Sequence, residues 1–480
     1  MIFKTEKSLI LSLIFLYILI FGVFACVRHY DFQTQAFDMG IFNQSFWNSL
    51  HGHFMESSIE NTQGVSNHFG MHWSPILLTL LPGYAIFPSP YFLLIIQTVI
   101  LAFGAWPLYL LAKKVLGESG KRIPLLLTIA YLIFPALHWV NSFDFHELAF
   151  LVPILIAAFY FIEIKNWLWS IIFLILAAAV KEDAILIVLF AGIYLILKSN
   201  KENNSWLTKQ RKIGLAIIIS AIIYFLIATK LIMPAFGGGL LHLSRFSDLG
   251  ETPGQIIKNL IINPALLINT IFAQQKLFYL LWLFLPVAFL PLLSPISLII
   301  LIPGLAENLL SSWGAQTAGL YHYDALLIGG IFIGAVYGAK NFLNIFNSKE
   351  KYLRWALIIL PITAFLMRSP ISPISFPIEL FRANDHWESY RQIVENMPSK
   401  ASISAETHII PHLSNREKIY KLGDEPEMTD IVIIDGSDLS GFNNEESFQK
   451  YADSYMETGK YNFTAIKDRY FILFKKELPK

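Results

Sequence analysis

The chain has 480 residues, of which 55% are hydrophobic, 15% are aromatic and only 15% are charged. Roughly a quarter of the residues are charged in an ordinary soluble domain, so this composition excludes a disordered or fibrous chain and indicates a membrane protein. The 36 Lys and Arg residues nearly balance the 35 Asp and Glu residues, and the net charge of +1 gives no sign of a nucleic-acid partner. A single cysteine, Cys26, excludes an intramolecular disulfide.

Long apolar runs predict about eleven transmembrane helices, because a bilayer core of about 30 Å needs roughly 20 apolar residues per crossing. The first run, residues 8–27, is too long for a signal-peptide core and predicts a retained anchor. The other runs lie at residues 91–112, 123–140, 148–164, 167–180, 184–197, 213–233, 277–293, 295–311, 325–339 and 355–367. The sequence therefore predicts an α-helical polytopic membrane protein.

Two segments are ambiguous, and the preference of Lys and Arg for the cytoplasmic side decides both. Residues 75–87 are too few for a full crossing and predict an interfacial helix. Lys181, Glu182 and Asp183 interrupt the run at 167–197, where ionisable residues at the bilayer centre would cost about 2.5 to 3.5 kcal/mol each. We therefore predict a hairpin of two short helices, with these three residues at the outer surface.

These choices define an orientation in the membrane. The loops at 198–212 and 340–354 are then cytoplasmic, whereas the loops at 28–90, 138–147 and 234–276 lie outside. The prediction is a multi-pass protein of the cell membrane, with a cytoplasmic N-terminus and an extracytoplasmic C-terminal domain.

The composition changes at the proline-rich stretch 368–377, and the chain beyond it is charged and mixed. We predict a transmembrane domain at 1–370, in which 28–90 is a first outer loop with interfacial helices, and a small extracytoplasmic α/β domain at 371–480. In this second domain ASISA and DIVIID are predicted strands, NEESFQKYADSYMETG a helix ending at Gly459, and YNFTAIKDRYFILF a pair of strands.

Ionisable and polar side chains gather in the loops assigned to the outer surface, and groups of this kind near the apolar layer mark functional sites. Because these loops should lie at one depth, we expect their side chains to converge on a single outward-facing site. The alternative is that each residue lies in the headgroup region without a functional role, since such residues are common there. The group comprises Asp31, Asp38, His68, His72, Asp144, His146, Glu147, Lys181, Glu182, Asp183, Glu307, Asn308, Tyr321, His322 and Asp324.

Several familiar catalytic motifs are absent from the sequence. No second histidine follows His146 at the spacing of a zinc-protease helix, and there is no GxSxG elbow, phosphate loop or GxGxxG fingerprint. His68 and His72 are four residues apart and would share a helical face, but two histidines are more often packing residues than metal ligands. We therefore assign no metal ligands.

The segments FDMGIFNQSFWNSLHG, HFGMHWSPILLTLLPGYAIFPSP, HWVNSFDFHELAF, VKED and YHYD closely resemble a prokaryotic membrane family, domain of unknown function 2079. The similarity covers most of the chain, including the tail stretch ISAETHIIPHLSNREKIY. This family resembles the GT-C glycosyltransferases, which use a polyprenyl-phosphate-linked sugar as donor. The resemblance implies a GT-C-like fold and the transfer of a hexosyl or pentosyl group to an unknown lipid, polymer or protein acceptor.

The resemblance also implies roles for individual residues. Asp38 occupies the place of an acidic residue in the first outer loop, although relatives often have an acidic pair there and Met39 follows here. Asp144 corresponds to an acidic residue after the third span, and Lys181 to a lysine that binds the donor phosphate. His72 lies where relatives often have a basic residue or histidine just before a proline.

The chemistry of sugar transfer agrees with these placements. A carboxylate that accepts the proton of the acceptor favours attack on the anomeric carbon, so Asp38 is the predicted general base. The leaving phosphate needs a cation, which we expect Lys181 to provide with the help of His72 or His322. The predicted donor-phosphate or substrate-binding residues are His72, Asp144, His146, Lys181, Glu182, Tyr321 and His322, and Asp31 is a secondary acidic candidate.

The predicted partners are a polyprenyl-phosphate-linked sugar and the lipid bilayer. The sequence leaves a divalent metal ion open as a cofactor and gives no oligomeric state. Two other functions also stay open. A transporter or lipid flippase would bind its substrate with the same groups, although no paired halves are visible. A non-catalytic membrane scaffold would need none of them.

Overall fold

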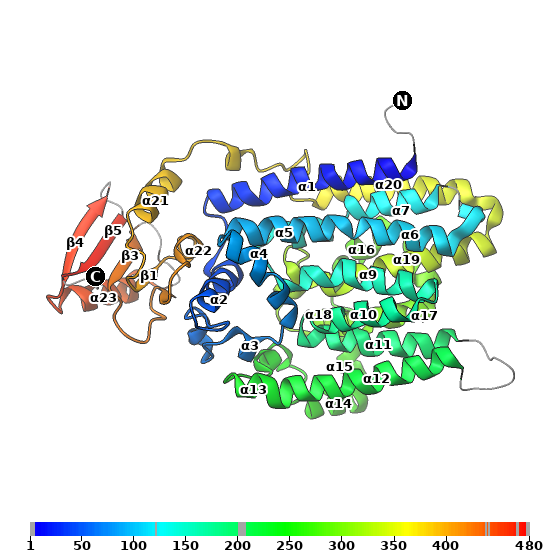
Figure 1. Ribbon diagram of the computed structural model, residues 1–480, viewed down its shortest axis with the longest axis horizontal. Coiled ribbons are helices and arrows are strands. Elements are labelled where there is room, and N and C mark those ends of the chain that lie inside the picture. The colour runs from blue at the N-terminus through cyan, green and yellow to red at the C-terminus, as the bar shows by residue number, and fades with distance from the viewer. Residues whose placement is uncertain are drawn as a thin grey trace.

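Most of the molecule is a bundle of apolar helices that run side by side, and a small sheet lies beyond one end of the bundle (Figure 1). The computed structural model describes residues 5–120, 122–199, 208–436, 439, 442–466 and 470–476. The molecule therefore has a helical membrane body with a C-terminal α/β lobe, as the sequence predicted.

Every predicted apolar run coincides with one or more helices. The helices at these runs are α1 (Glu6–Tyr30), α5 (Pro90–Phe103), α6 (Ala105–Leu116), α7 (Ile123–Leu132), α8 (Pro135–Ser142), α9 (Leu151–Glu163), α10 (Trp167–Ala178), α11 (Glu182–Lys198), α12 (Lys209–Ile227), α13 (Met233–Ala235), α16 (Gln274–Phe284), α17 (Pro295–Leu298), α18 (Ile302–Leu310), α19 (Ala325–Ile345) and α20 (Glu350–Arg368). Two amphipathic helices, α14 (Pro253–Ile262) and α15 (Pro264–Ile271), precede α16.

Several of these helices are long and apolar enough to cross a membrane. In the described part of the chain, five qualify, at Glu6–Tyr30, Pro90–Leu116, Ile123–Ser142, Lys209–Ala235 and His322–Ile345. A further pair, α15 with the segment Gln274–Val287, is bent by 61° and would make a sixth span. The chain is therefore a multi-pass membrane protein, and the number of about eleven crossings stays a prediction.

Both ambiguous segments form short helices. The chain is extended at Lys181, with φ −166° and ψ 159°, so the segment forms α10 and α11 rather than one continuous helix. Residues 75–87 form η3 (Pro75–Thr79) and α4 (Leu81–Ile86), each started by a proline in its first turn, where the missing N–H costs nothing. Neither is long enough to cross a bilayer.

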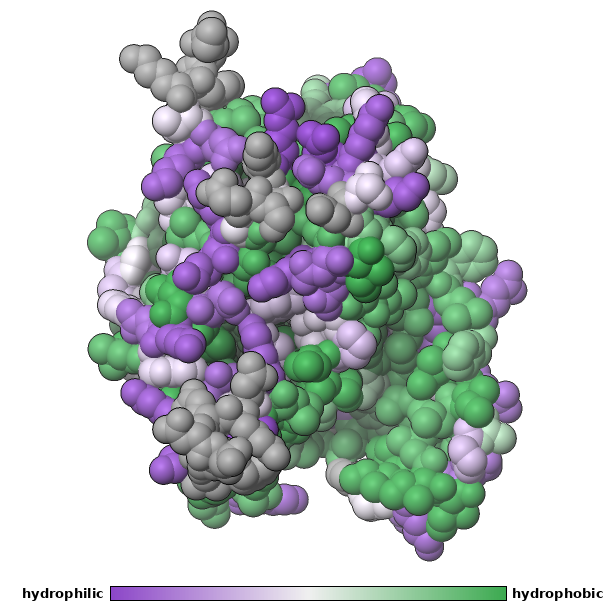
Figure 2. Space-filling model, turned by 90° about the vertical axis from the view of Figure 1, so that its right-hand side faces the viewer, coloured by the Kyte–Doolittle hydropathy of each residue, from purple (hydrophilic) through white to green (hydrophobic). Residues whose placement is uncertain are grey.

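The burial of the helices differs across the bundle. In an apolar 18-residue stretch of the span His322–Ile345, which contains α19, 83% of the residues are buried. Gly338 lets this helix approach the Leu290 carbonyl, where a Cβ atom would clash. In contrast, only 17% of the residues are buried in the corresponding stretch of the span that begins with α12, and Ile219 and Leu231 are exposed. Figure 2 faces the end of the bundle opposite the C-terminal lobe and shows hydrophilic side chains gathered over part of that end, with hydrophobic side chains beside them.

The C-terminal lobe contains a five-stranded sheet with the order β2-β1-β3-β5-β4. Strands β1, β2 and β3 are parallel, and β5 pairs antiparallel with both β3 and β4. The strands are β1 (Ile403–Ala405), β2 (Ile419–Lys421), β3 (Ile431–Asp435), β4 (Tyr461–Ile466) and β5 (Tyr470–Lys475), and the helices are α21 (Asp385–Glu395), α22 (Ile410–Leu413) and α23 (Glu445–Met456).

The secondary structure predicted for this lobe is confirmed. The segments ASISA and DIVIID contain β1 and β3, and α23 is the predicted helix, after which Gly459 adopts a φ of +64°. The predicted strand pair forms β4 and β5, whereas residues 467–469 between them lie outside the described residues. Helices α21 and α22 and strand β2 were not predicted, and the domain boundary at residue 370 stays a prediction.

The lobe packs against the first outer loop, which contains η1 (Ala36–Gly40), α2 (Ile41–Leu50), η2 (Glu60–Gln63) and α3 (His68–Met71). The buried Gln44 side chain donates hydrogen bonds to the Arg416 and Glu417 carbonyls at 3.1 and 3.0 Å. Ser58 Oγ donates to the Ile419 carbonyl at 2.7 Å. The loop that carries the predicted general base is therefore fixed by the C-terminal lobe.

Candidate functional site

A cavity of about 510 Å³ lies where the first outer loop, the start of α11 and the loops before α14 and α19 meet. Such a volume suits a small-molecule ligand. Its wall is formed by Gln35, Phe37, Asp38, Ile41, Phe42, Glu60, His68, Met71, His72, Phe143, His146, Lys181, His242, Arg245, Trp313, Ala315, Tyr321, His322 and Tyr323.

The structure brings six of the predicted site residues to this wall and leaves three outside it. Asp38, His72, His146, Lys181, Tyr321 and His322 line the cavity, and they come from five separate segments of the sequence. Asp31, Asp144 and Glu182 do not line it. The expected convergence of outer loops on one place is therefore what the structure shows for the six, whereas their chemical roles stay predictions.

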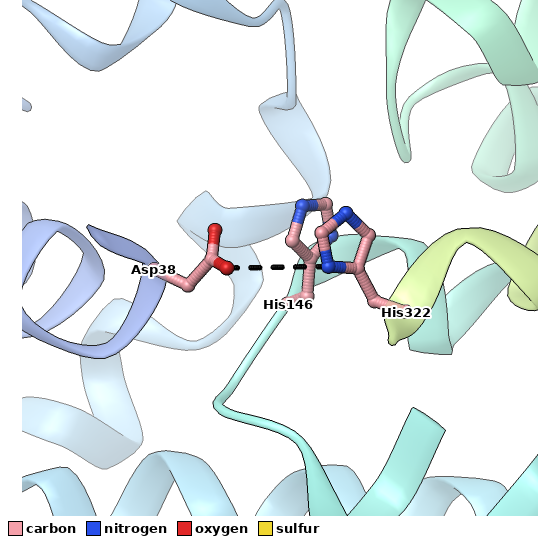
Figure 3. A group of neighbouring side chains, drawn as sticks. All are labelled: Asp38, His146 and His322. Atoms are coloured by element: carbon pink, nitrogen blue, oxygen red, sulfur yellow. Dashed lines mark ion pairs between the residues drawn. The ribbon is translucent and has the colours of Figure 1, made fainter. Parts of the chain in front are cut away.

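Asp38 faces two histidines across the cavity (Figure 3). Its Oδ2 atom lies 4.0 Å from Nδ1 of His322, and the rings of His322 and His146 are stacked with their centres 3.6 Å apart. His322 Nδ1 is buried and has no hydrogen-bond partner in the described part of the chain. The three side chains therefore present one carboxylate and two imidazoles to the same small volume.

The backbone at Asp38 is strained. Its φ of +71° and ψ of −85° interrupt η1, and such a conformation is costly for a residue with a side chain. Burial raises the pKa of the carboxyl to about 6, although the nearby cations Lys181 and Arg245 lower it in part. Asp38 can therefore exchange a proton near neutral pH.

Two cations line the cavity. Lys181 occupies the N-cap position of α11, and its ammonium lies 3.5 Å from the Asp183 carboxylate. Burial lowers the pKa of Lys181, but the negative charges of Asp183 and Glu182 outweigh this effect. The pKa of Lys181 is therefore raised overall, and the side chain stays cationic. The Arg245 guanidinium stacks 4.6 Å from the Trp313 ring, and its buried Nε has no partner among the described residues. Together they form an anion-binding wall.

Glu182 lies outside the cavity wall and contacts His72, which lines it. Its carboxylate accepts hydrogen bonds from the Trp73 backbone N–H at 2.9 Å and lies 2.8 Å from His72 Nδ1. Burial and the positive charge of Lys181 lower the pKa of His72, so its ring is neutral and donates to this carboxylate. His72 then stacks on His242 with the ring centres 5.1 Å apart.

Asp144 and Asp31 also hold the structure together outside the cavity. Asp144 Oδ2 accepts a hydrogen bond from the Gln35 backbone N–H at 2.8 Å, three residues before Asp38. Burial raises the pKa of Asp144 to about 7, against the opposing effect of Arg28. Asp31 lies 3.7 Å from Arg391 on α21 and so contacts the lobe.

The candidate metal ligands also differ from the pair considered from sequence. His68 and His72 each bind their own carboxylate, Glu60 and Glu182, rather than converging on one point. Instead, Asp38, His146 and His322 each offer a ligand atom, and these atoms lie within 4.8 Å of one another. One carboxylate and two imidazoles are a donor set that suits zinc and similar divalent ions.

Sequence reasoning missed several residues of the wall, most importantly Arg245, Glu60 and Tyr323. The loop at 234–276 was placed outside, but no residue in it was selected. His242 and Arg245, three residues apart in the HLSRF stretch of this outer loop, were the available signal. Glu60 gave no such signal, because a single acidic residue in a polar loop is common.

The comparisons with known proteins agree with this fold. A structure of ArnT from Cupriavidus metallidurans bound to undecaprenyl phosphate is similar at a TM-score of 0.53 and 9% identity, with 98% of each chain covered. An oligosaccharyltransferase from Archaeoglobus fulgidus tethered to an acceptor peptide is similar at a TM-score of 0.50 and 12% identity, covering 98% of this chain and 74% of that one. No functionally curated protein matches the sequence.

These two neighbours show that the fold is that of the GT-C glycosyltransferases, as the resemblance implied. Residues 28–472 match the family described as predicted membrane protein (DUF2079), which spans nearly the whole chain. The chain therefore belongs to the DUF2079 family of predicted membrane proteins.

Proposed function

We propose that this protein is a membrane glycosyltransferase that moves a sugar from a polyprenyl phosphate to an acceptor on the outer face of the membrane. The observation that carries the proposal is a cavity lined by a carboxylate, Asp38, and by the cations Lys181 and Arg245, whose charges act on that carboxylate. The GT-C fold supports the reaction class, and the undecaprenyl phosphate bound to ArnT supports a polyprenyl-phosphate donor.

The two sides of the cavity suit the two halves of the reaction. Asp38 accepts the proton of the acceptor hydroxyl or amine as the acceptor atom bonds to the anomeric carbon. The bond from that carbon to the phosphate oxygen breaks, and the phosphate keeps the electron pair. Lys181 and Arg245 stabilise the added negative charge, so no acid is needed for the leaving group. A direct displacement of this kind inverts the anomeric centre.

A divalent metal ion would fit beside this carboxylate. Asp38, His146 and His322 would hold it, since their ligand atoms converge and His322 Nδ1 has no partner in the described residues. Such an ion would supply positive charge to polarise a phosphate or hydroxyl oxygen. Chelation would then lower activity, whereas it would leave activity unchanged if Asp38 acts only as a base.

The basic residues support an orientation of the protein in the membrane. The cavity lies at the Lys181 end of α11, and the other end carries Lys198 beside Lys209 and Arg211 at the start of α12. Basic residues favour the cytoplasmic side of a membrane. We therefore place the cavity and the C-terminal lobe outside the cell, with η3 and α4 at the interface where a prenyl chain could be guided to the cavity.

The test is transfer of radiolabel from a polyprenyl-phosphate sugar by the purified protein in lipid vesicles. We expect Asp38→Asn to lower the rate of transfer about 10²- to 10⁴-fold. Asp31→Asn is the matched control, because Asp31 lies outside the cavity and should leave the rate within about threefold. Equal activity of Asp38→Asn and wild type would remove Asp38 from the mechanism, and accumulation of intact substrate inside sealed vesicles would favour a transporter.

A further inference from the structure

Glu60 and His68 form a buried pair in the cavity wall that the proposed reaction does not use. His68 Nδ1 lies 2.9 Å from Glu60 Oε1, and each side chain is only 2% exposed. A carboxylate can only accept hydrogen bonds, so the imidazole donates through Nδ1 and its other nitrogen, Nε2, is left to face elsewhere. Both residues border the cavity.

Each member of the pair keeps an unused polar atom. Glu60 Oε2 and His68 Nε2 are buried and have no hydrogen-bond partner among the residues that the structure describes. A buried polar atom without a partner costs about 1 to 3 kcal/mol. Since both residues line the cavity, a ligand there supplies the missing partners once the two side chains turn these atoms toward it.

The surroundings hold the pair in place before any ligand binds. The His68 backbone N–H donates to the Met55 carbonyl at 2.8 Å, and Asn67 caps the short helix that His68 begins. The Phe42 ring packs edge-on against the imidazole, with the ring centres 4.9 Å apart. A pair fixed in this way loses little conformational entropy when it binds.

The chemistry of the two atoms selects the ligand group. Glu60 Oε2 accepts a hydrogen bond and repels a phosphate, whereas His68 Nε2 accepts when the ring is neutral and donates when it is protonated. Only a group that both donates and accepts satisfies the pair in either state, and a hydroxyl does so. The anion-binding cations Lys181 and Arg245 are separate members of the same wall.

We propose that Glu60 and His68 are the subsite that recognises hydroxyl groups of the transferred sugar. This inference rests on the proposed function, which supplies a sugar linked to a phosphate. The cavity is then divided, with cations for the phosphate and the Glu60–His68 pair for the sugar. A site built around a substrate hydroxyl discriminates strongly against ligands that lack it, so this pair would set donor specificity.

The test compares a soluble prenyl phosphate with four sugar conjugates of the same prenyl phosphate. Binding of citronellyl phosphate is measured by calorimetry beside that of citronellyl-phosphate glucose, galactose, mannose and N-acetylglucosamine, with the full-length protein in detergent. We expect at least one sugar to strengthen binding to the wild type about 10- to 100-fold over the bare phosphate. Glu60→Gln and His68→Phe should abolish this gain and leave the affinity for citronellyl phosphate within about twofold.

Two further variants separate the subsites. Lys181→Met should weaken both ligands by the same factor, because it removes charge from the phosphate side. Glu163→Gln, a matched change of a carboxylate outside the cavity wall, should change neither affinity. If His68→Phe does not fold, the isosteric Glu60→Gln decides the question.

The measurements distinguish a failure of the proposed function from a failure of the Glu60–His68 subsite alone. If the wild type binds neither citronellyl phosphate nor any of its sugars, the proposed function fails as well. If the wild type binds the bare phosphate as tightly as every sugar ligand, only the Glu60–His68 subsite is overturned. The same holds if Glu60→Gln keeps the full gain from the sugar, or weakens both ligands equally, since the pair would then be structural.

Discussion

The two ends of α11 carry two lysines in opposite situations, one half-buried and one buried. At its C-terminal end, Lys198 Nζ lies 2.7 Å from Glu163 and 2.9 Å from the Tyr337 hydroxyl, which itself donates to Glu163 at 2.7 Å. At the N-terminal end, the nearest carboxylate to Lys181 Nζ is that of Asp183, at 3.5 Å, and the side chain borders an open cavity.

The difference shows that burial of a charge does not by itself mark a functional group. Lys181 is buried and Lys198 is half-buried, but the groups around Lys198 form a closed network in which each charge has a close partner. In the cavity wall that Lys181 shares with His322 and Glu60, by contrast, His322 Nδ1 and Glu60 Oε2 have no hydrogen-bond partner in the described residues. Unused hydrogen-bonding atoms beside an open volume therefore indicate the ligand site.

Replacing each lysine by methionine should affect the two ends of α11 in different ways. We expect Lys181→Met to lower sugar transfer about 10³-fold, because a charge that stabilises the leaving phosphate is lost. Lys198→Met should leave the rate per folded molecule within about twofold and lower the free energy of unfolding by about 1 to 2 kcal/mol, since the pair is partly exposed. Transfer assays and thermal unfolding of both variants measure the two effects.

The comparison would be wrong if both variants lost activity to the same extent. It would also be wrong if Lys181→Met kept wild-type activity while its thermal stability fell, because the cluster at this end would then be structural. Lys181→Arg, which keeps the charge but changes its shape, should retain more activity than Lys181→Met.

The dependence of the rate on pH provides a sharper test at the cavity end. Because burial raises the pKa of Asp38 to about 6, the carboxyl is protonated and inactive as a base below that pH. We expect kcat/KM to fall about tenfold per pH unit below 6 and to reach a plateau above 7. The profile should be measured with a chelator present, because a bound cation would shift the midpoint to lower pH.

Asp38→Glu is the control for this assignment, since it keeps a carboxyl group in the cavity. A profile that stays flat between pH 5 and 8 in the wild type would contradict the role of Asp38 as base. A midpoint that is the same in Asp38→Asn would assign the titration to another group.

The helical body was predictable from sequence because the bilayer imposes it. Runs of apolar residues have to form helices in lipid, and the cost of Lys181 at the bilayer centre was enough to predict the break before α11. The convergence of Asp38, His146 and His322 followed from placing their loops at one depth. These predictions rest on the cost of placing charged groups and unpaired backbone groups in lipid, which constrains every membrane protein.

The direction of individual side chains was not predictable. Asp144 and Asp38 are both acids in outer loops, but Asp144 turns to the Gln35 N–H and supports the loop, whereas Asp38 reaches the cavity through a strained backbone. Arg245 reaches the wall through a loop whose path depends on packing against Trp313. Contacts between segments far apart in the chain fix such directions, and no local pattern encodes them.

The contact between the lobe and the first loop extends the comparison to a third polar cluster, and here we expect the smallest effect. Gln44 is fully buried and saturated: its Oε1 accepts from Ser58 N at 2.9 Å, and its Nε2 donates to the Arg416 and Glu417 carbonyls. As with Lys198 on α11, a cluster in which every polar group has a partner is expected to be structural.

We therefore expect Gln44→Leu, which has a similar volume, to lower the free energy of unfolding by about 1 to 3 kcal/mol, because it leaves buried carbonyls without donors. The rate of transfer per folded molecule should stay within about twofold. Limited proteolysis should cut the variant faster between the bundle and the lobe. A loss of activity without a loss of stability would contradict this expectation, because a cluster with all its hydrogen bonds made would then be functional. Gln44 lies only six residues from Asp38 and would in that case act on the cavity through η1.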